Sequence, residues 1–183
     1  MNYQNSNRHQ LRLLILMFIT FAINSSLGGE AITQEVKPNF ISANLLKAGT
    51  KAPLFTLRSS TKLTISLNKY KGKIILLDWW YIGCSPCIKA YKDLMLLKQQ
   101  YGDSLVILGM NSINRRGQIN RFKRKHNYTD TVLMATKEVK KAYKIRAYPT
   151  IYIINKEGYI SYSTAGYYHN LRAELQSAIG KAL

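Results

Sequence analysis

The chain has 183 residues, the size of one ordinary domain. It carries 27 Lys and Arg against 9 Asp and Glu, a net charge of +18, and 46% of its residues are hydrophobic, which excludes a disordered or collagen-like chain. Its two cysteines, Cys84 and Cys87, are too few for a disulfide-stapled mini-protein or a four-cysteine zinc site.

The first 29 residues are typical of a targeting segment. Arg8 and Arg12 give a basic start, and an apolar run of 11 residues follows from Leu13 to Ile23. This run has the length of a secretory signal and is short for a membrane span, which needs about 20 residues. We therefore expect residues 1–29 to be a signal peptide, with an uncleaved anchor as the alternative. The protein is then exported to the periplasm, either soluble or anchored by its N-terminus.

The rest of the chain divides into a linker and one domain. Residues 30–50 show no clear periodicity and are predicted to be a leader or linker, and the domain covers 51–183. Apolar runs bounded by turn residues predict strands, and helical spacing of apolar residues predicts helices. The predicted strands are 54–58, 63–66, 73–81, 105–110, 150–154 and 159–163. The predicted helices are 86–101, 115–126, 136–144 and 171–183.

The order of these elements indicates the fold class. Residues 73–81 contain an unusually apolar run, which is typical of a central strand buried on both faces. Strands alternate with helices up to residue 144, and a hairpin and a helix then close the chain. This order predicts an α/β sandwich with a mixed sheet.

The two cysteines come directly after this central strand, at the start of the following helix. Residues i and i+3 share a helix face, so both sulfurs can meet, and Pro86 suits the first turn. At the helix N-terminus the thiolate of Cys84 is favoured, so Cys84 is the expected attacking group. Cys87, one turn into the helix, is expected to be less exposed and to resolve the mixed disulfide. From spacing alone, a structural disulfide and a metal site remain alternatives to redox exchange.

A set of ordered segments resembles the thioredoxin superfamily, and in particular its exported TlpA/ResA-like branch. The similar segments are 52–57, 67–73, 75–87, 143–150 and 155–160. The resemblance covers about residues 51–183 and implies a thioredoxin-like three-layer sandwich, with helices on both faces of a central mixed sheet. It also implies an enzyme, a thiol–disulfide oxidoreductase that needs no cofactor and no metal. Its partners are then client proteins with thiols or disulfides and an upstream, membrane-bound electron donor.

Asp78 is an acid inside the apolar central strand, where a charge is costly unless it is partnered or functional. By the resemblance it matches the buried aspartate of thioredoxins, which implies that it takes the proton from Cys87 when that thiol attacks. The alternative is a structural carboxylate at the strand end.

The resemblance also implies a substrate-binding edge. The bond between Tyr148 and Pro149 is then cis and faces the cysteines, so that the Tyr148 backbone pairs with an extended client segment. An ordinary trans turn is the alternative. Four further residues beside the cysteines are predicted to contact the client: Trp80, Gly83, Ser85 and Pro86. Trp79 is predicted to be core.

Some positions depart from the family pattern. Gly83 stands where thioredoxins usually have Trp. Ala90 stands where several TlpA/ResA-like proteins have a glutamate, so this position departs from the members that act in cytochrome maturation. The pair Ser85–Pro86 lacks the His of strongly oxidising relatives, so we expect a reducing rather than an oxidising role. Residues 77–84 lack the Pro-x-x-x-Thr-x-x-Cys pattern of peroxiredoxins. A non-catalytic binding module or a metal chaperone is the competing function.

Basic residues are frequent between 115 and 144. We expect solvated helix faces, with docking to an acidic partner or an anionic membrane surface as the alternative. Export argues against nucleic acid. We expect a monomer.

Overall fold

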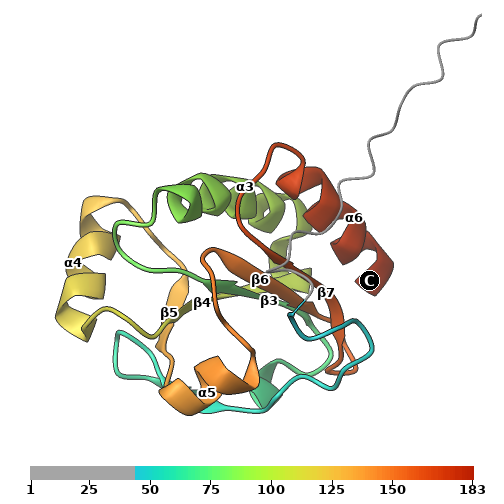
Figure 1. Ribbon diagram of the computed structural model, residues 1–183, viewed down its shortest axis with the longest axis horizontal. Helices are drawn as coiled ribbons and strands as arrows, with labels where there is room; N and C mark the ends of the chain where they lie inside the picture. The colour runs from blue at the N-terminus through green and yellow to red at the C-terminus, as the bar shows by residue number, and fades with distance from the viewer. Residues whose placement is uncertain (1–43) are drawn as a thin grey trace, which may run out of the picture. The chain divides into compact units, whose positions relative to one another are not determined.

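The computed structural model describes residues 44–183, so the predicted targeting segment and most of the predicted linker lie outside the described residues. A five-stranded sheet forms the middle layer, with helices on both sides (Figure 1). Its strands are β3 (Ile74–Trp79), β4 (Leu105–Asn111), β5 (Thr131–Met134), β6 (Thr150–Ile154) and β7 (Ile160–Ala165). A separate small sheet pairs β1 (Thr56–Arg58) with β2 (Thr64–Ser66). The helices are α3 (Ser85–Tyr101), α4 (Arg116–Lys125), α5 (Lys137–Ala142) and α6 (Leu171–Ala182), with short 3-10 turns η2 (Leu67–Tyr70) and η3 (Gly102–Ser104).

The central sheet is mixed, as the sequence predicted. Its order is β5-β4-β3-β6-β7, with β3 parallel to β4 and β4 parallel to β5. The two strands that form the late hairpin, β6 and β7, are antiparallel to each other, and β6 is antiparallel to β3. All six residues of β3 are buried, which confirms the central strand. The end of β3 therefore lies in the middle of the sheet edge that carries the cysteines.

The two faces of β3 serve two separate cores, because successive side chains of a strand point to opposite faces. Ile74 and Leu76 pack with residues of α3 and α6. Ile75, Leu77 and Trp79 pack on the other side, in the cluster that also contains residues of β1 and β2. Trp79 is fully buried, which confirms it as core. Asp78 follows Leu76 by two residues in β3, so both side chains point to the same face of the sheet. The carboxyl group of Asp78 therefore points toward α3.

Two differences from the predicted elements stand out. Strand β5 was not predicted, because its extended conformation depends on the hydrogen-bonded pairing with β4, which the local sequence pattern does not show. The last part of the predicted linker also packs on the domain. Leu45 and Leu46 are buried, and the Leu46 amide donates to the Tyr152 hydroxyl at 3.2 Å. Within residues 44–183, no helix has both the length and the apolarity of a membrane span.

Candidate active site

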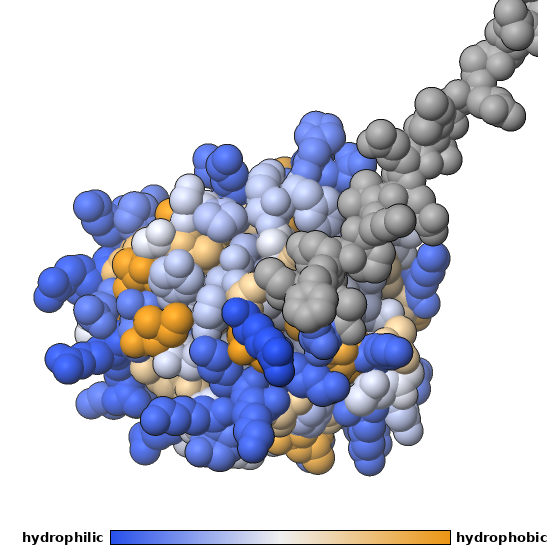
Figure 2. Space-filling model, viewed as in Figure 1, coloured by the Kyte–Doolittle hydropathy of each residue, from blue (hydrophilic) through white to orange (hydrophobic). Residues whose placement is uncertain are grey.

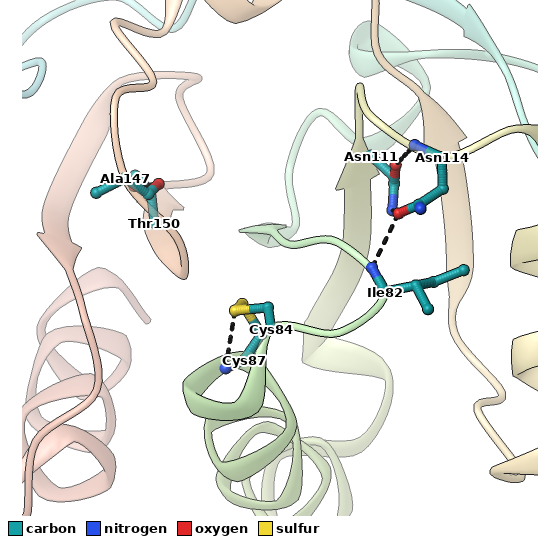
Figure 3. The surroundings of a disulfide bond; sticks show 7 residues. All are labelled: Ile82, Cys84, Cys87, Asn111, Asn114, Ala147 and Thr150. Carbon is teal, nitrogen blue, oxygen red and sulfur yellow. Dashed lines mark hydrogen bonds between the residues drawn. A yellow bond between two sulfur atoms is a disulfide. The ribbon is translucent and has the colours of Figure 1, made fainter.

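The cysteine pair lies where the loop after β3 enters α3. Cys84 and Cys87 form a disulfide, with their Cα atoms 5.2 Å apart. Cys84 is the N-cap of α3, and its Sγ accepts a hydrogen bond from the Cys87 amide at 3.2 Å (Figure 3). Pro86 occupies the first turn, as expected. The sulfur of Cys84 therefore faces the unpaired N–H groups of the helix start, which stabilise a thiolate.

The exposure of the two cysteines differs from the prediction. Cys87 was expected to be less exposed than Cys84, but Cys84 is 2% and Cys87 is 4% exposed. Both sulfurs belong to a buried cluster with Trp80 and Tyr128, and Tyr148 packs against it. In the disulfide state, exposure therefore does not distinguish the attacking cysteine from the resolving cysteine. The N-cap position of Cys84 does distinguish them.

The loop that contains Pro149 packs against the cysteine cluster. The Tyr148–Pro149 bond is cis, as the resemblance implied. The loop is closed by a hydrogen bond from the Thr150 hydroxyl to the Ala147 carbonyl at 2.7 Å (Figure 3). The Tyr148 ring meets Tyr81 edge to face, with centroids 5.2 Å apart. Tyr148 is half-buried, so the exposed part of its side chain and the neighbouring backbone form the surface beside the disulfide.

Asp78 lies under the α3 face of the sheet and is 1% exposed. Its strand neighbours are Gly109 on β4 and Ile151 on β6, so neither brings a positive charge. Its Oδ1 atom has no hydrogen-bond partner. Burial, and to a smaller degree the charge of Asp130, raise the pKa of Asp78 to about 7. A carboxyl group with this pKa can hold or release a proton at neutral pH.

Asp130, which precedes β5, was missed by the sequence analysis. It is half-buried, and its Oδ2 atom has no hydrogen-bond partner. Burial raises its pKa to about 6, while the cations of Lys123 and Lys98 act in the opposite direction. The sequence pattern does not single out Asp130, because its electrostatic interaction with Asp78 depends on the strand order β3-β4-β5.

An aromatic pocket of about 420 Å³ adjoins Cys87 and Asp78. Trp80, Tyr128 and Phe122 form a cluster in which the Trp80 ring centroid lies 5.0 Å from that of Tyr128 and 5.3 Å from that of Phe122. Trp80 is 3% exposed and lines this pocket together with Cys87 and Asp78, so it lies beside the cysteines but has almost no surface open to solvent.

The three remaining predicted contact residues lie at the surface. Gly83, Ser85 and Pro86 are all exposed beside the disulfide. Gly83 has a φ of 96°, in the region that residues with a side chain rarely adopt. The backbone conformation therefore favours glycine at this position.

Two asparagines that the sequence analysis missed support the loop before Cys84. Asn114 Oδ1 accepts from the Ile82 amide at 2.9 Å and from Asn111 Nδ2 at 3.2 Å (Figure 3). Asn111 Oδ1 in turn accepts from the amides of Ile113 and Asn114. The available signal was an Asn-x-x-Asn stretch after a buried strand, since parallel neighbours end at the same sheet edge.

Metal ligands are sparse around the thiols. Across residues 44–183 there is no group of three or more His, Cys, Asp or Glu side chains that could hold a metal ion.

Comparison with known proteins gives consistent results. The sequence profile of the AhpC/TSA family matches residues 48–163. The chain is 29% identical over 118 residues to "Thioredoxin-like protein YneN" of Bacillus subtilis, covering 63% of this chain and 69% of the relative. It is 26% identical over 121 residues to "Thiol-disulfide oxidoreductase ResA" of the same organism, covering 65% and 68%. A crystal structure from Chlorobium tepidum, described as a thiol:disulfide interchange protein DsbE, has the same fold, with a TM-score of 0.69, 22% identity, and coverage of 75% of this chain and 98% of its own.

Proposed function

From the premise that this chain belongs to the AhpC/TSA family, we propose that it is an exported thiol–disulfide oxidoreductase that reduces disulfides in client proteins. The observation that carries the proposal is the pair Cys84–Cys87 at the start of α3, with Cys84 as its N-cap. The thioredoxin-like fold and the relatives named as thiol–disulfide oxidoreductases support the same activity. The missing Pro-x-x-x-Thr-x-x-Cys pattern favours disulfide exchange over peroxide reduction.

The proposed first step uses the reduced enzyme. The Cys84 thiolate attacks one sulfur of the client disulfide, the client S–S bond breaks, and one client sulfur leaves as a thiolate that takes a proton from water. Cys84 is now joined to the client in a mixed disulfide. The N-cap position favours this step, because the helix start stabilises the attacking thiolate.

The second step resolves the mixed disulfide. The Cys87 thiol gives its proton to the Asp78 carboxylate and attacks the sulfur of Cys84. The bond between Cys84 and the client breaks, the second client thiolate leaves, and the Cys84–Cys87 disulfide forms. Two electrons have then passed from the enzyme to the client. An upstream dithiol donor, which we place at the membrane, restores the reduced pair.

We assign client contact to the exposed surface beside the cysteines. Gly83, Ser85 and Pro86 lie at the surface, and the backbone of Tyr148 and Pro149 is the edge on which an extended client segment pairs. Trp80 contributes to client contact from within the aromatic pocket that it lines.

Export rests on the composition of residues 1–29, and a periplasmic monomer is proposed with it. Expression of the full chain followed by fractionation and N-terminal sequencing tests both export and cleavage. Recovery of the intact chain from the cytoplasm would contradict export.

The experiment that tests the activity is reduction of insulin with dithiothreitol as electron donor. We expect the wild-type chain to accelerate the reaction and the double variant Cys84→Ser/Cys87→Ser to lose the acceleration. Metal content measured on the same samples separates this function from a metal chaperone. An inactive wild-type chain that carries a stoichiometric metal would overturn the proposal.

The direction of electron flow is tested by equilibrating the pair with a thiol redox buffer. The absence of His between the cysteines leads us to expect a potential nearer that of thioredoxin, about −270 mV, than that of strong oxidants, about −120 mV.

A further inference from the structure

A second pocket, of about 480 Å³, lies on the opposite side of the sheet from α3 and is lined by cations. The cationic residues are Lys137, Lys140, Lys141, Lys144 and Arg146, which come from α5 and the loop that follows it. Hydrophilic side chains cover this part of the surface, at the lower left of the view in Figure 2, where Figure 1 places α5. Among the described residues, 44–183, no acidic side chain lines the pocket. Such a concentration of one charge attracts groups of the opposite charge.

The acid on α5 interacts with one cation of this pocket, Lys137, and leaves the pocket with an excess of positive charge. Glu138 lies in the first turn of the helix and is not a lining residue. Hydrogen bonds from its own backbone amide and from the Thr136 hydroxyl, and to a smaller degree the charge of Lys137, lower the pKa of Glu138, so its carboxylate is held at the helix start and interacts with Lys137. Glu138 therefore balances part of the charge of Lys137, and the pocket keeps its excess of positive charge through Lys140, Lys141, Lys144 and Arg146.

Direct contacts connect the pocket to the disulfide. The ammonium group of Lys140 lies 5.5 Å from the centroid of the Tyr148 ring. Tyr148 packs edge to face on Tyr81, whose carbonyl accepts a hydrogen bond from the Cys84 amide at 3.2 Å. Tyr148 also precedes the cis-proline at which we place the client segment. A client that follows this edge away from the cysteines therefore comes to the cations.

We propose that this basic pocket selects client segments with acidic side chains close to the reactive disulfide. The inference rests on the proposed function and names its substrate class. A client peptide fits this pocket better than a lipid surface does. The cations line a concave site beside the client-binding edge, and a flat bilayer can contact only the rim of a concave site. Charge complementarity at such a site acts mainly on specificity and on the rate of association.

The test compares peptides that contain the same disulfide and differ only in flanking Asp or Asn residues, with the full chain as enzyme and dithiothreitol as donor. We expect kcat/KM for the Asp peptide to exceed that for the Asn peptide roughly tenfold at low salt. The ratio should fall toward one at about 1 M salt, where screening is nearly complete. Equal rates for both peptides at low salt would overturn this inference and leave the proposed function standing, whereas reduction of neither peptide would overturn the proposed function.

A pair of variants locates the effect. The variant Lys141→Gln/Lys144→Asn/Arg146→Gln removes three charges from the pocket, and its Asp-to-Asn ratio should approach one. Asn suits position 144, because the φ of Lys144 is 52° and Asn tolerates this region better than most residues. An Asp-to-Asn ratio that stays at the wild-type value would overturn the proposal. If that variant also lost binding to phosphatidylglycerol vesicles, the cations would be assigned to a lipid surface instead.

The matched control removes three charges elsewhere. Lys69, Lys71 and Lys73 are exposed at the other end of β3 from the cysteines, so their combined replacement by Gln changes the net charge equally. We expect this variant to keep the Asp-to-Asn ratio. An equal loss of preference in the control would assign the effect to net charge and overturn the assignment to the pocket.

Discussion

Asp78 on β3 lies directly opposite Gly109 on the parallel strand β4. A Cβ atom at Gly109 would lie 2.9 Å from Trp80 Nε1 and 3.2 Å from the Tyr128 hydroxyl oxygen. The aromatic side chains therefore use the space over β4, and this position brings no cation to Asp78. The carboxyl group is buried without a compensating charge, which is the condition that raises its pKa.

The first prediction concerns the stability of the variant Asp78→Asn in the disulfide form. The pKa of Asp78 rises from 3.8 to about 7 on folding, so the folded state holds one proton more between these pH values. Wild-type stability should therefore fall as the pH rises through this window and then stay level. Asn resembles the protonated acid, so the variant should equal wild type near pH 4 and exceed it above pH 7 by up to about 4 kcal/mol.

Urea unfolding at pH 4, 6 and 8 measures this difference. Asp103, which is exposed in η3, provides a control in the variant Asp103→Asn, for which we expect no comparable gain. A gain for Asp78→Asn that is equally large at pH 4 and pH 8 would contradict an ionisation effect.

The second prediction concerns the proton transfer itself. In single-turnover resolution of a mixed disulfide on Cys84, the wild-type rate should rise as Asp78 ionises around pH 7. Asp78→Asn should be slower by about tenfold or more at pH 7.5, because Cys87 then loses its proton acceptor. Stopped-flow release of a chromophoric client thiol follows this step. An identical pH profile in both proteins would leave Asp78 with a structural role only.

The third prediction assigns the two sulfurs. Limited alkylation of the reduced chain at slightly acid pH should label Cys84 first, since its thiolate is stabilised at the start of α3. Peptide mapping identifies the labelled residue. Cys87→Ser should trap mixed disulfides with clients, and Cys84→Ser should not. Predominant labelling of Cys87 would reverse the assignment.

The fourth prediction concerns the support of the active-site loop. Asn114→Ala removes the acceptor for the Ile82 amide and should cost about 1 kcal/mol of stability. It should also lower the rate of insulin reduction and speed hydrogen exchange at Ile82. Asn120→Ala is the matched control, because it loses a hydrogen bond of similar length, 2.9 Å to the Ser60 carbonyl, that does not involve the loop before Cys84. Equal loss of activity in the two variants would argue against a specific role of Asn114.

The fifth prediction compares two glycines. Gly109→Ala places a methyl group against Trp80, Tyr128 and Val132 and should destabilise the fold by about 1–3 kcal/mol. Gly117→Ala in α4 meets no neighbouring atom within 4 Å and should stabilise the protein by up to about 1 kcal/mol. Thermal unfolding measures both. A Gly109→Ala variant as stable as wild type would show that the aromatic side chains can move aside.

The sequence determined those features that depend on local pattern. The apolar run 73–81 identified β3, the position of Pro86 fixed the start of α3, and the spacing of Cys84 and Cys87 predicted their pairing. Each depends on residues that are neighbours along the chain. The resemblance added the cis bond at Pro149, which neither periodicity nor composition indicates.

Only the tertiary structure decided which distant residues meet at the sheet edge. The strand order places Asp78 opposite Gly109, joins Ile82 to Asn114, and brings Lys140 to Tyr148 beside the cysteines. It also buries Trp80 in the cluster that contains both cysteines. These relations arise because β4 and β6 pair on either side of β3, and the order of strands in a sheet is set by packing across the whole domain, not by the pattern within any one segment.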